Sequence, residues 1–459
     1  MAGIGFVLRK LSKQDNLTGL FQAYVYSALI STGPWMFTII SLGAISYLAG
    51  KFTDVETLAE FRRVVIYNFS FSLVFSAPIF MVITRYLADS IYEKNVERTP
   101  GILLGGTAFI FATQLPFATL FYFGYANISN GLALSAVINF MLISEIWLLS
   151  VFVTALKDYK TVLIAFASGM GFAVASSAFL VDWFNLIGIL TSFSLGLTII
   201  ASLLIGRIFA EYPYRFKDPF AFVKYFKKYW EVALTGVIYN AASWVDKWIM
   251  WFSDEADHSP THLYLYPNYD SAMFLAYLTI VPSMAMFIMS IETNFYEHYL
   301  KFYRDIQNGS NFQQIQTNHQ RIIKALIASA RNFLVIQGSV TVIAILMSAQ
   351  FFNSFDVNYM QISIYRFGVL GSFFQVLILF INVILSYFDC RQAYLKLQLL
   401  FFFSNMIFTL ICLHYGFRYY GVGYFLASVT TFIASAIYMF RYILRLPFHT
   451  FVTTNASVK

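Results

Sequence analysis

The sequence is poor in charged residues and in cysteine. Lys, Arg, Asp and Glu together make up 12% of its 459 residues, about half of the ~25% that soluble domains carry. Hydrophobic residues make up 59%, so an ordinary soluble domain is excluded and an integral membrane protein is indicated. The two cysteines, Cys390 and Cys412, are too few for a disulfide framework. We expect them near opposite faces of the bilayer, too far apart to form a bridge.

The sequence also lacks the short motifs of common catalytic and nucleotide-binding sites. It contains no Walker lysine motif, no zincin helix signature and no nucleophile elbow. His258 and His262 lie beside acidic residues, but acidic outer loops are commoner than metal sites at this spacing. We therefore predict a protein that is not an enzyme and has no cofactor and no metal site. Any active transport would draw on an ion gradient, on the substrate or on a partner.

Long apolar runs are abundant, and each is long enough to cross a bilayer. A helix needs ~20 apolar residues to span a hydrocarbon core of ~30 Å, and we count twelve such runs. They lie at residues 18–48, 64–88, 101–123, 132–155, 161–181, 185–208, 229–252, 271–295, 332–351, 364–388, 394–415 and 421–441. These runs predict an all-α integral membrane fold of about twelve transmembrane helices.

The positions of Lys and Arg predict the orientation of this fold. When the N-terminus is placed inside, most of the 30 basic residues fall on the cytoplasmic side, as the positive-inside rule requires. Both termini are then cytoplasmic. The net charge of +7 faces anionic membrane lipid, and we do not interpret it as nucleic-acid binding.

The polar interruptions predict the domain organisation. Residues 1–208 form an N-terminal six-helix lobe, which begins with a helix lying on the inner membrane surface. A basic cytoplasmic linker, 209–228, leads to a C-terminal six-helix lobe, 229–459. That lobe carries a cytoplasmic helical insertion at 297–331. Because six is an even number, each lobe enters the membrane from the same side, as in transporters built from doubled bundles.

Ionisable residues at membrane depth are the first candidates for a substrate pathway, because a charge there is costly unless it faces water or a partner. Glu145 lies near the middle of the fourth span. It is either a carboxylate in an aqueous cavity or a protonated acid bonded to a neighbouring helix. Asp246 and Lys247 lie in the seventh span. Adjacent residues diverge by ~100° around a helix, so we expect Asp246 to face a cavity and Lys247 to extend outward, or both to pair with other helices.

Further polar candidates lie within or at the ends of other spans. Asn240 and Asn294 can offer hydrogen bonds to a passage, and Glu292 lies near the inner end of the eighth span. Arg85 and Asp89 are one helical turn apart. We expect these last two to form a structural ion pair at a helix end.

Several stretches of the sequence together resemble one transporter family. The stretches are MAGIGFVLRKL at the N-terminus, GLFQAYVYSALISTGPWMF, TRYLADSIYEK, YNAASWVDKWIMWF, ETNFYEHYLKFY and SYFDCRQAYL. They resemble the PelG family, inner-membrane transporters of the Pel exopolysaccharide system. That family belongs to the multidrug/oligosaccharidyl-lipid/polysaccharide flippase superfamily. The resemblance covers nearly the whole chain.

The resemblance implies a multi-pass protein of the bacterial inner membrane, with two six-helix lobes around a central cavity. It implies transport of a nascent, N-acetylhexosamine-rich polysaccharide made by a cytosolic glycosyltransferase that uses UDP-sugars. It also implies membrane partners in the Pel synthase complex, one of which senses cyclic-di-GMP. Two alternatives stay open. One is a proton- or sodium-coupled multidrug exporter with Glu145 as the coupling carboxylate, and the other is a membrane-embedded sugar-transferring enzyme.

Overall fold

The structure, a computed structural model, describes residues 17–156, 158–290, 295–354 and 361–453. Within these ranges the chain is helical, and its extended structure is limited to an isolated bridge between Asp257 and Leu265. Ten helices in the described part of the chain are long and apolar enough to cross a membrane. The prediction of an all-α integral membrane fold is confirmed. The exact number of twelve crossings and the side on which the termini lie stay predictions, and the predicted surface helix at the N-terminus lies outside the described residues.

By internal contacts the chain forms two compact units, Gly33–Pro267 and Asn268–Lys459, the latter together with the residues up to Thr32. We call them the α3–α8 unit and the α9–α16 unit. The first contains α2 from Gly33 onward (α2 is Leu17–Ala49), α3 (Val55–Tyr92), α4 (Thr99–Thr119), η1 (Leu120–Tyr125), α5 (Asn130–Leu156), α6 (Tyr159–Glu211), α7 (Val223–Lys228) and α8 (Trp230–Met250). The second contains α9 (Pro267–Leu278, from Asn268), α10 (Val281–Ser290), α11 (Tyr296–Gln307), α12 (Phe312–Ser354), α13 (Gln361–Tyr387), α14 (Arg391–Tyr415), η3 (Phe417–Tyr419), α15 (Val422–Leu444), α16 (Leu446–Phe448) and η4 (His449–Thr453).

The boundary between these units differs from the boundary drawn from the sequence. The sequence predicts a division at residues 209–228, which would place α8 with the second half of the chain. In the structure α8 packs along α3, so it groups with the first half. The two lobes proposed for the membrane-embedded protein stay a prediction.

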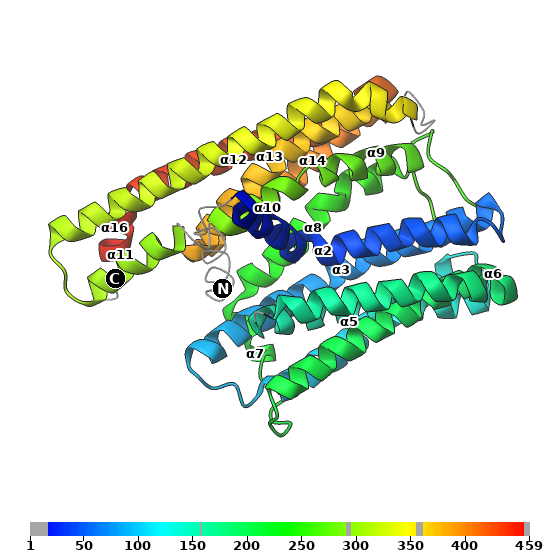
Figure 1. Ribbon diagram of the computed structural model, residues 1–459, viewed down its shortest axis with the longest axis horizontal. Coiled ribbons are helices and arrows are strands. Elements are labelled where there is room, and N and C mark those ends of the chain that lie inside the picture. The colour runs from blue at the N-terminus through cyan, green and yellow to red at the C-terminus, as the bar shows by residue number, and fades with distance from the viewer. Residues whose placement is uncertain (1–16, 157, 291–294, 355–360, 454–459) are drawn as a thin grey trace. The chain divides into compact units, whose positions relative to one another are not determined.

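Helix α6 is a helical hairpin rather than one straight rod (Figure 1). A straight helix of 53 residues would be about 80 Å long, far more than a bilayer requires. The chain turns at Asn185, where φ is 47° and ψ is −124°. Gly169 and Gly196, on opposite legs, then lie so close that a Cβ on Gly196 would be 2.5 Å from the Gly169 carbonyl oxygen. The two legs match the predicted spans 161–181 and 185–208.

The close approach of the legs gives a matched test. We expect Gly169→Ala to lower the free energy of unfolding by about 1–3 kcal/mol, because the new methyl group would overlap with the Gly196 backbone and Ile200. Gly171, two residues further along the same leg, has open space around its Cβ direction. Gly171→Ala should therefore be neutral or stabilise by up to ~1 kcal/mol. Denaturant unfolding of the purified variants in detergent measures both, and equal effects would contradict the packing described.

The predicted cytoplasmic linker is packed on the α3–α8 unit. Its backbone at Lys217 and Pro219 crosses α4 directly over Gly101 and Gly105, where any Cβ would overlap with a linker carbonyl oxygen. The Phe222 side chain is fully buried. Ion pairs join Lys217 to Glu97 at 3.4 Å and Arg98 to Asp218 at 3.2 Å. The linker is thus held by backbone contact, a buried ring and surface charges.

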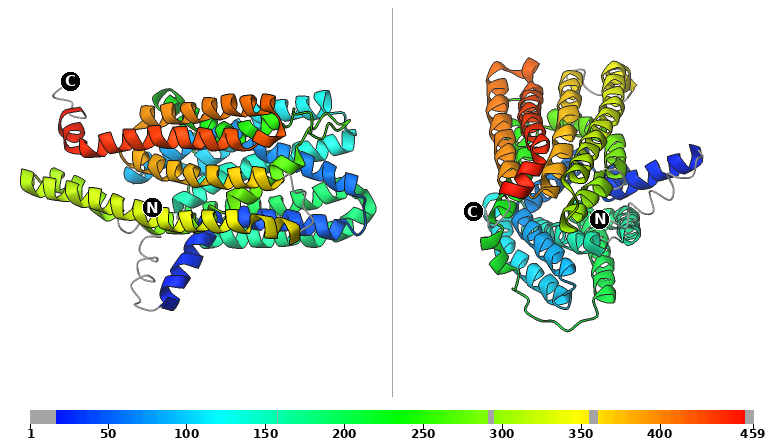
Figure 2. Two further views of the ribbon diagram at one scale, coloured as in Figure 1. Left: turned by 90° about the horizontal axis from the view of Figure 1, so that it is seen from above. Right: turned by 90° about the vertical axis from the view of Figure 1, so that its left-hand side faces the viewer.

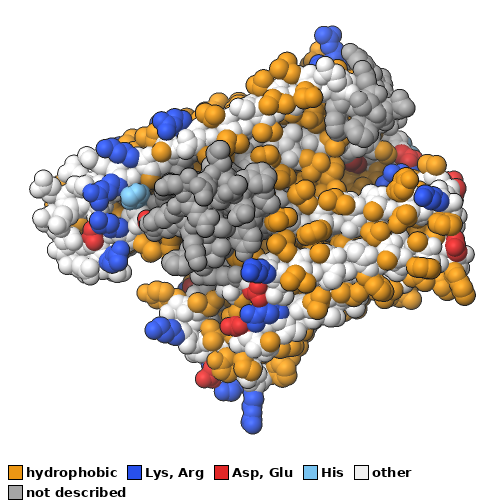
Figure 3. Space-filling view, viewed as in Figure 1, with side chains coloured by type: hydrophobic (Ala, Val, Ile, Leu, Met, Phe, Trp, Pro, Cys, Tyr) orange, Lys and Arg blue, Asp and Glu red, His pale blue; other side chains and the backbone are white. Residues whose placement is uncertain are grey.

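In the α9–α16 unit, α15 packs against α13 and α14, and α12 packs against α13 (Figure 2). Helix α12 has 43 residues, and its N-terminal end continues past the ends of α13 and α15 (Figure 2). This end and α11 form the predicted helical insertion, and they share a buried core of Phe302, Ile322 and Phe333. Lys and Arg side chains gather over α11 and this end of α12 (Figure 3).

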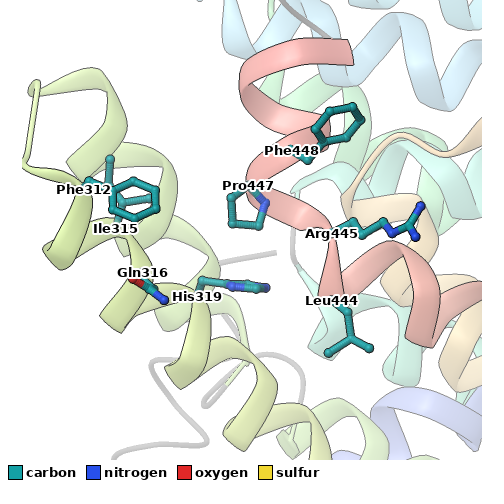
Figure 4. Close-up of a pocket in the computed structure, with 8 residues that line it drawn as sticks. All are labelled: Phe312, Ile315, Gln316, His319, Leu444, Arg445, Pro447 and Phe448. Carbon is teal, nitrogen blue, oxygen red and sulfur yellow. The ribbon is translucent and has the colours of Figure 1, made fainter.

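A hollow of about 400 Å³ lies where the N-terminal end of α12 meets the end of α15 and α16. His319 points from α12 toward the end of α15 (Figure 4), and its Nε2 lies 2.7 Å from the Ile443 carbonyl oxygen. Because a carbonyl oxygen only accepts, Nε2 is the donor in this hydrogen bond. The bond fixes the α12 extension to the C-terminal end of α15.

Candidate functional site

Glu145 lies on α5 and is buried, with 7% of its surface exposed. Thr107 on α4 donates a hydrogen bond of 2.6 Å to its Oε1. Among the described residues, its Oε2 has no hydrogen-bond partner. A buried carboxyl group with one unsatisfied oxygen is costly unless it binds a proton or a cation. Glu145 therefore has the surroundings of a proton- or cation-binding group.

Asp246 and Lys247 form a direct ion pair on α8. The Lys247 ammonium lies 3.2 Å from both carboxylate oxygens of Asp246 and donates a further hydrogen bond of 3.1 Å to the Ser243 carbonyl oxygen. Asp246 is fully buried and Lys247 nearly so. The expectation that the two side chains face different ways is wrong, because the flexible lysine stem folds back toward the preceding turn. Their charges neutralise each other within one helix.

The remaining candidates have separate surroundings. Asn240 donates a hydrogen bond of 2.9 Å to the Gly236 carbonyl oxygen, four residues earlier on α8. Arg85 Nε lies 3.8 Å from Asp89 Oδ1, and the Tyr229 hydroxyl donates to Asp89 Oδ2 at 2.8 Å. The Arg85 guanidinium also lies over the Tyr229 ring. These contacts tie the end of α3 to the start of α8. Glu292 and Asn294 lie outside the described residues.

Buried polar side chains connect four elements of the α3–α8 unit. Asn68 on α3 donates to Asn139 on α5 at 2.9 Å and accepts from Tyr122 on η1 at 2.7 Å. Asn139 donates to Ser194 on α6 at 3.0 Å. Each of these groups is buried and hydrogen-bonded, so the network holds helices together. Sequence reasoning did not pair these residues, because their helices are far apart along the chain.

The loop 253–266 is attached to one face of α3, which the sequence did not reveal. Ser259 donates to Glu60 at 2.8 Å, and Arg63 forms ion pairs with Asp257 and with Glu60. The Tyr67 hydroxyl bonds both the backbone N–H and the carbonyl oxygen of Tyr264 at 3.0 Å. Glu60, Arg63 and Tyr67 recur at helical spacing, which is the signal that could have found them. We call these three residues the loop clamp.

The histidines of this loop are engaged in hydrogen bonds with the backbone. His258 Nε2 lies 3.0 Å from the Ser253 carbonyl oxygen, and His262 Nδ1 lies 3.1 Å from the Tyr125 carbonyl oxygen. Within the described ranges, no group of three or more His, Cys, Asp or Glu side chains is placed to hold a metal ion.

Comparison with known proteins gives both a family and a fold. Residues 1–451 match the family model PelG, an exopolysaccharide exporter (EPS-E). No curated protein matches the sequence. Among solved structures, the chain is similar to a transporter of the MOP superfamily from Pyrococcus furiosus, whose binding pocket is described as having reverse polarity. The two structures have a TM-score of 0.62 and 13% sequence identity, and the match covers 92% of this chain and 96% of that chain.

Two further structures show the same likeness. They are an outward-facing and an inward-facing conformation of a multidrug resistance MATE family transporter of the MOP superfamily. Their TM-scores are 0.62 and 0.57, each at 15% identity, covering 92% and 90% of this chain and 96% and 98% of those chains. At this identity the likeness shows a shared fold.

Proposed function

The chain belongs to the PelG family of exopolysaccharide exporters, and from that premise we propose that it moves a nascent Pel-type polysaccharide, rich in N-acetylhexosamine, across the bacterial inner membrane. The observation that carries the proposal is the family match over residues 1–451. Family and fold together point to a transporter rather than an enzyme.

The buried charges agree with a substrate of little net charge. A polar glycan cannot cross hydrocarbon, so it needs a hydrated passage lined by groups that hydrogen-bond to its hydroxyls. A polyanion would require unpaired basic side chains along such a passage. On α8 the buried Lys247 is instead neutralised by Asp246. This pair supplies polarity without net charge, as a glycan passage requires.

We also propose where the predicted partners would bind. A cytosolic glycosyltransferase that uses UDP-sugars, and a membrane partner that senses cyclic-di-GMP, would each need a surface outside the bilayer. The α11–α12 extension is amphipathic and basic, with Lys301, Arg304, Arg321 and Lys324 on it, and α12 is longer than a bilayer requires.

The multidrug-exporter alternative is favoured by one observation, the unsatisfied Oε2 of Glu145. Glu145→Gln separates the two functions, since glutamine can still accept from Thr107 but cannot release a proton. We expect cells that carry Glu145→Gln to secrete polysaccharide within about twofold of wild type, because passage of a neutral glycan needs no carboxylate at this point. Surface polysaccharide is measured by lectin binding at matched protein levels, in cells deleted for the native chain.

Two outcomes would count against the proposal. If the wild-type chain does not restore polysaccharide secretion to the deleted cells, glycan export is wrong. If the chain lowers the accumulation of cationic dyes, and Glu145→Gln abolishes that effect, the multidrug exporter is the better description.

A further inference from the structure

A cavity of about 330 Å³ lies within the α3–α8 unit, bounded by α3, η1, α8 and the loop 253–266. Eight of the nine side chains that line it are Phe, Tyr or Trp, and the ninth is His262. We call it the aromatic pocket. A cavity of this size suits one or two rings of a small organic ligand.

The rings of the aromatic pocket form two stacked groups, which meet at Tyr67 and Phe71 with an interplanar angle of 47°. Phe71 and Trp248 stack with an interplanar angle of 4° and a centroid distance of 5.2 Å. Tyr67 stacks on Trp251 at 19° and 4.7 Å, and on Phe121 at 23° and 5.9 Å. Phe121 continues the row to Tyr125 at 29° and 5.5 Å. The two groups differ in direction, and Tyr264 stands edge-on to Phe252 at 86°, so the pocket offers flat apolar ring surface in more than one direction.

The pocket carries no formal charge. None of the described side chains that line it is Lys, Arg, Asp or Glu, and the nearby Arg63 is paired with Glu60 and Asp257. A cage for an organic cation turns several ring faces toward one point. Here Phe71 and Trp248 stack on each other, so one face of each ring is already covered, and the open ring surface belongs to Tyr125 and Phe252, which are more than half exposed. The geometry favours a neutral ligand over a cation.

His262 supplies a hydrogen-bond acceptor at the rim. Its Nδ1 lies 3.1 Å from the Tyr125 carbonyl oxygen, which only accepts, so Nδ1 carries the proton. In the neutral imidazole Nε2 is then an acceptor. Tyr125 and Phe252 at the same rim are more than half exposed. The rim can therefore accept a hydrogen bond from a hydroxyl or an amide N–H while the rings contact an apolar face.

Aromatic surface beside a hydrogen-bond acceptor matches the two-sided chemistry of a sugar ring, which has an apolar C–H face and a polar edge. We propose that the aromatic pocket binds sugar units of the glycan in transit. The inference rests on the proposed function. The loop clamp attaches the loop 253–266 to α3, so the pocket is preorganised before a ligand arrives.

The test uses the purified full-length chain in lipid nanodiscs and the tetrasaccharide of N-acetylglucosamine as the probe. Trp248 and Trp251 lie in the pocket, so saturable fluorescence quenching reports occupancy. We expect the double variant Tyr125→Ala/Phe252→Ala to raise the Kd at least tenfold, because it removes two exposed contact rings. Phe179→Ala is the matched control, since Phe179 is an exposed ring of the same unit outside the pocket, and it should leave the Kd unchanged.

A second variant and a secretion assay distinguish loss of ligand binding from misfolding and from failure of the proposed function. His262→Phe keeps a ring but removes the acceptor, and it should weaken binding about tenfold; circular dichroism at the temperature of the binding assay shows that the variant is folded. If wild type secretes polysaccharide but binds no probe, or if the double variant binds as tightly as wild type, the pocket assignment is overturned and export stands. Tight binding of tetraphenylphosphonium without binding of the tetrasaccharide also overturns it. Failure of the wild-type chain to restore secretion overturns the function itself.

Discussion

Lys247→Met is expected to lower the free energy of unfolding by about 3–5 kcal/mol, because it leaves the fully buried Asp246 carboxylate without its paired ammonium. Methionine has nearly the volume of the lysine stem, so packing is largely kept and the loss reports the charge. Thermal unfolding in detergent, monitored by circular dichroism, measures the change. The amount of folded protein in membranes should fall in parallel.

The double variant Asp246→Asn/Lys247→Met is the matched control, and it also separates two roles for the pair. Removing both charges should restore most of the lost stability, since replacing a buried ion pair by neutral groups of similar size is often close to neutral. If polysaccharide secretion recovers with stability, the pair is structural. If the stable double variant does not secrete, the charges serve the substrate pathway. A single Lys247→Met variant as stable as wild type would contradict the buried pair.

Gly101→Ala/Gly105→Ala is expected to detach the linker from α4, because each new methyl group would occupy the position of a linker carbonyl oxygen. Helix backbone on one side and linker backbone on the other leave no flexible side chain to move aside. Trypsin cleavage after Arg215 and Lys217 should then become at least tenfold faster, as released segments are cut far more readily than docked ones. Peptide mapping of membranes that carry each variant measures the rate.

Gly206→Ala is the control for this experiment. Gly206 is a helical glycine of the same unit, and no atom lies within 4 Å of its Cβ direction. It should leave the cleavage rate unchanged. Equal rates in wild type and in the double variant would show that the linker does not rest on α4.

The fold class could be predicted from the sequence because each membrane-spanning helix must itself contain enough apolar residues to cross the bilayer. The two legs of α6 were separated correctly for the same reason, although the turn at Asn185 shows no proline or glycine at that position. The grouping of α8 with α3 could not be predicted. It depends on contacts between segments that are distant in sequence, and apolar length carries no information about which helices become neighbours.

The candidate site could also be predicted only in part, because contacts between side chains cannot be read from the sequence. Asp246, Lys247 and Glu145 stood out because charged residues are rare at membrane depth. The pairing of Asp246 with Lys247 could not be predicted, because the helical angle between Cα–Cβ bonds does not describe where a long lysine stem ends. The aromatic pocket was hidden for another reason. Its rings come from α3, η1 and α8, and in a sequence with 19% aromatic residues no single ring is conspicuous.

The chain passes from one compact unit to the other at only two peptide bonds, Thr32–Gly33 and Pro267–Asn268. The first lies inside α2, immediately before Pro34, which removes one backbone hydrogen bond from that helix. The second lies at the start of α9. Pro34 thus weakens α2 by one hydrogen bond beside the residue at which the chain leaves one unit for the other.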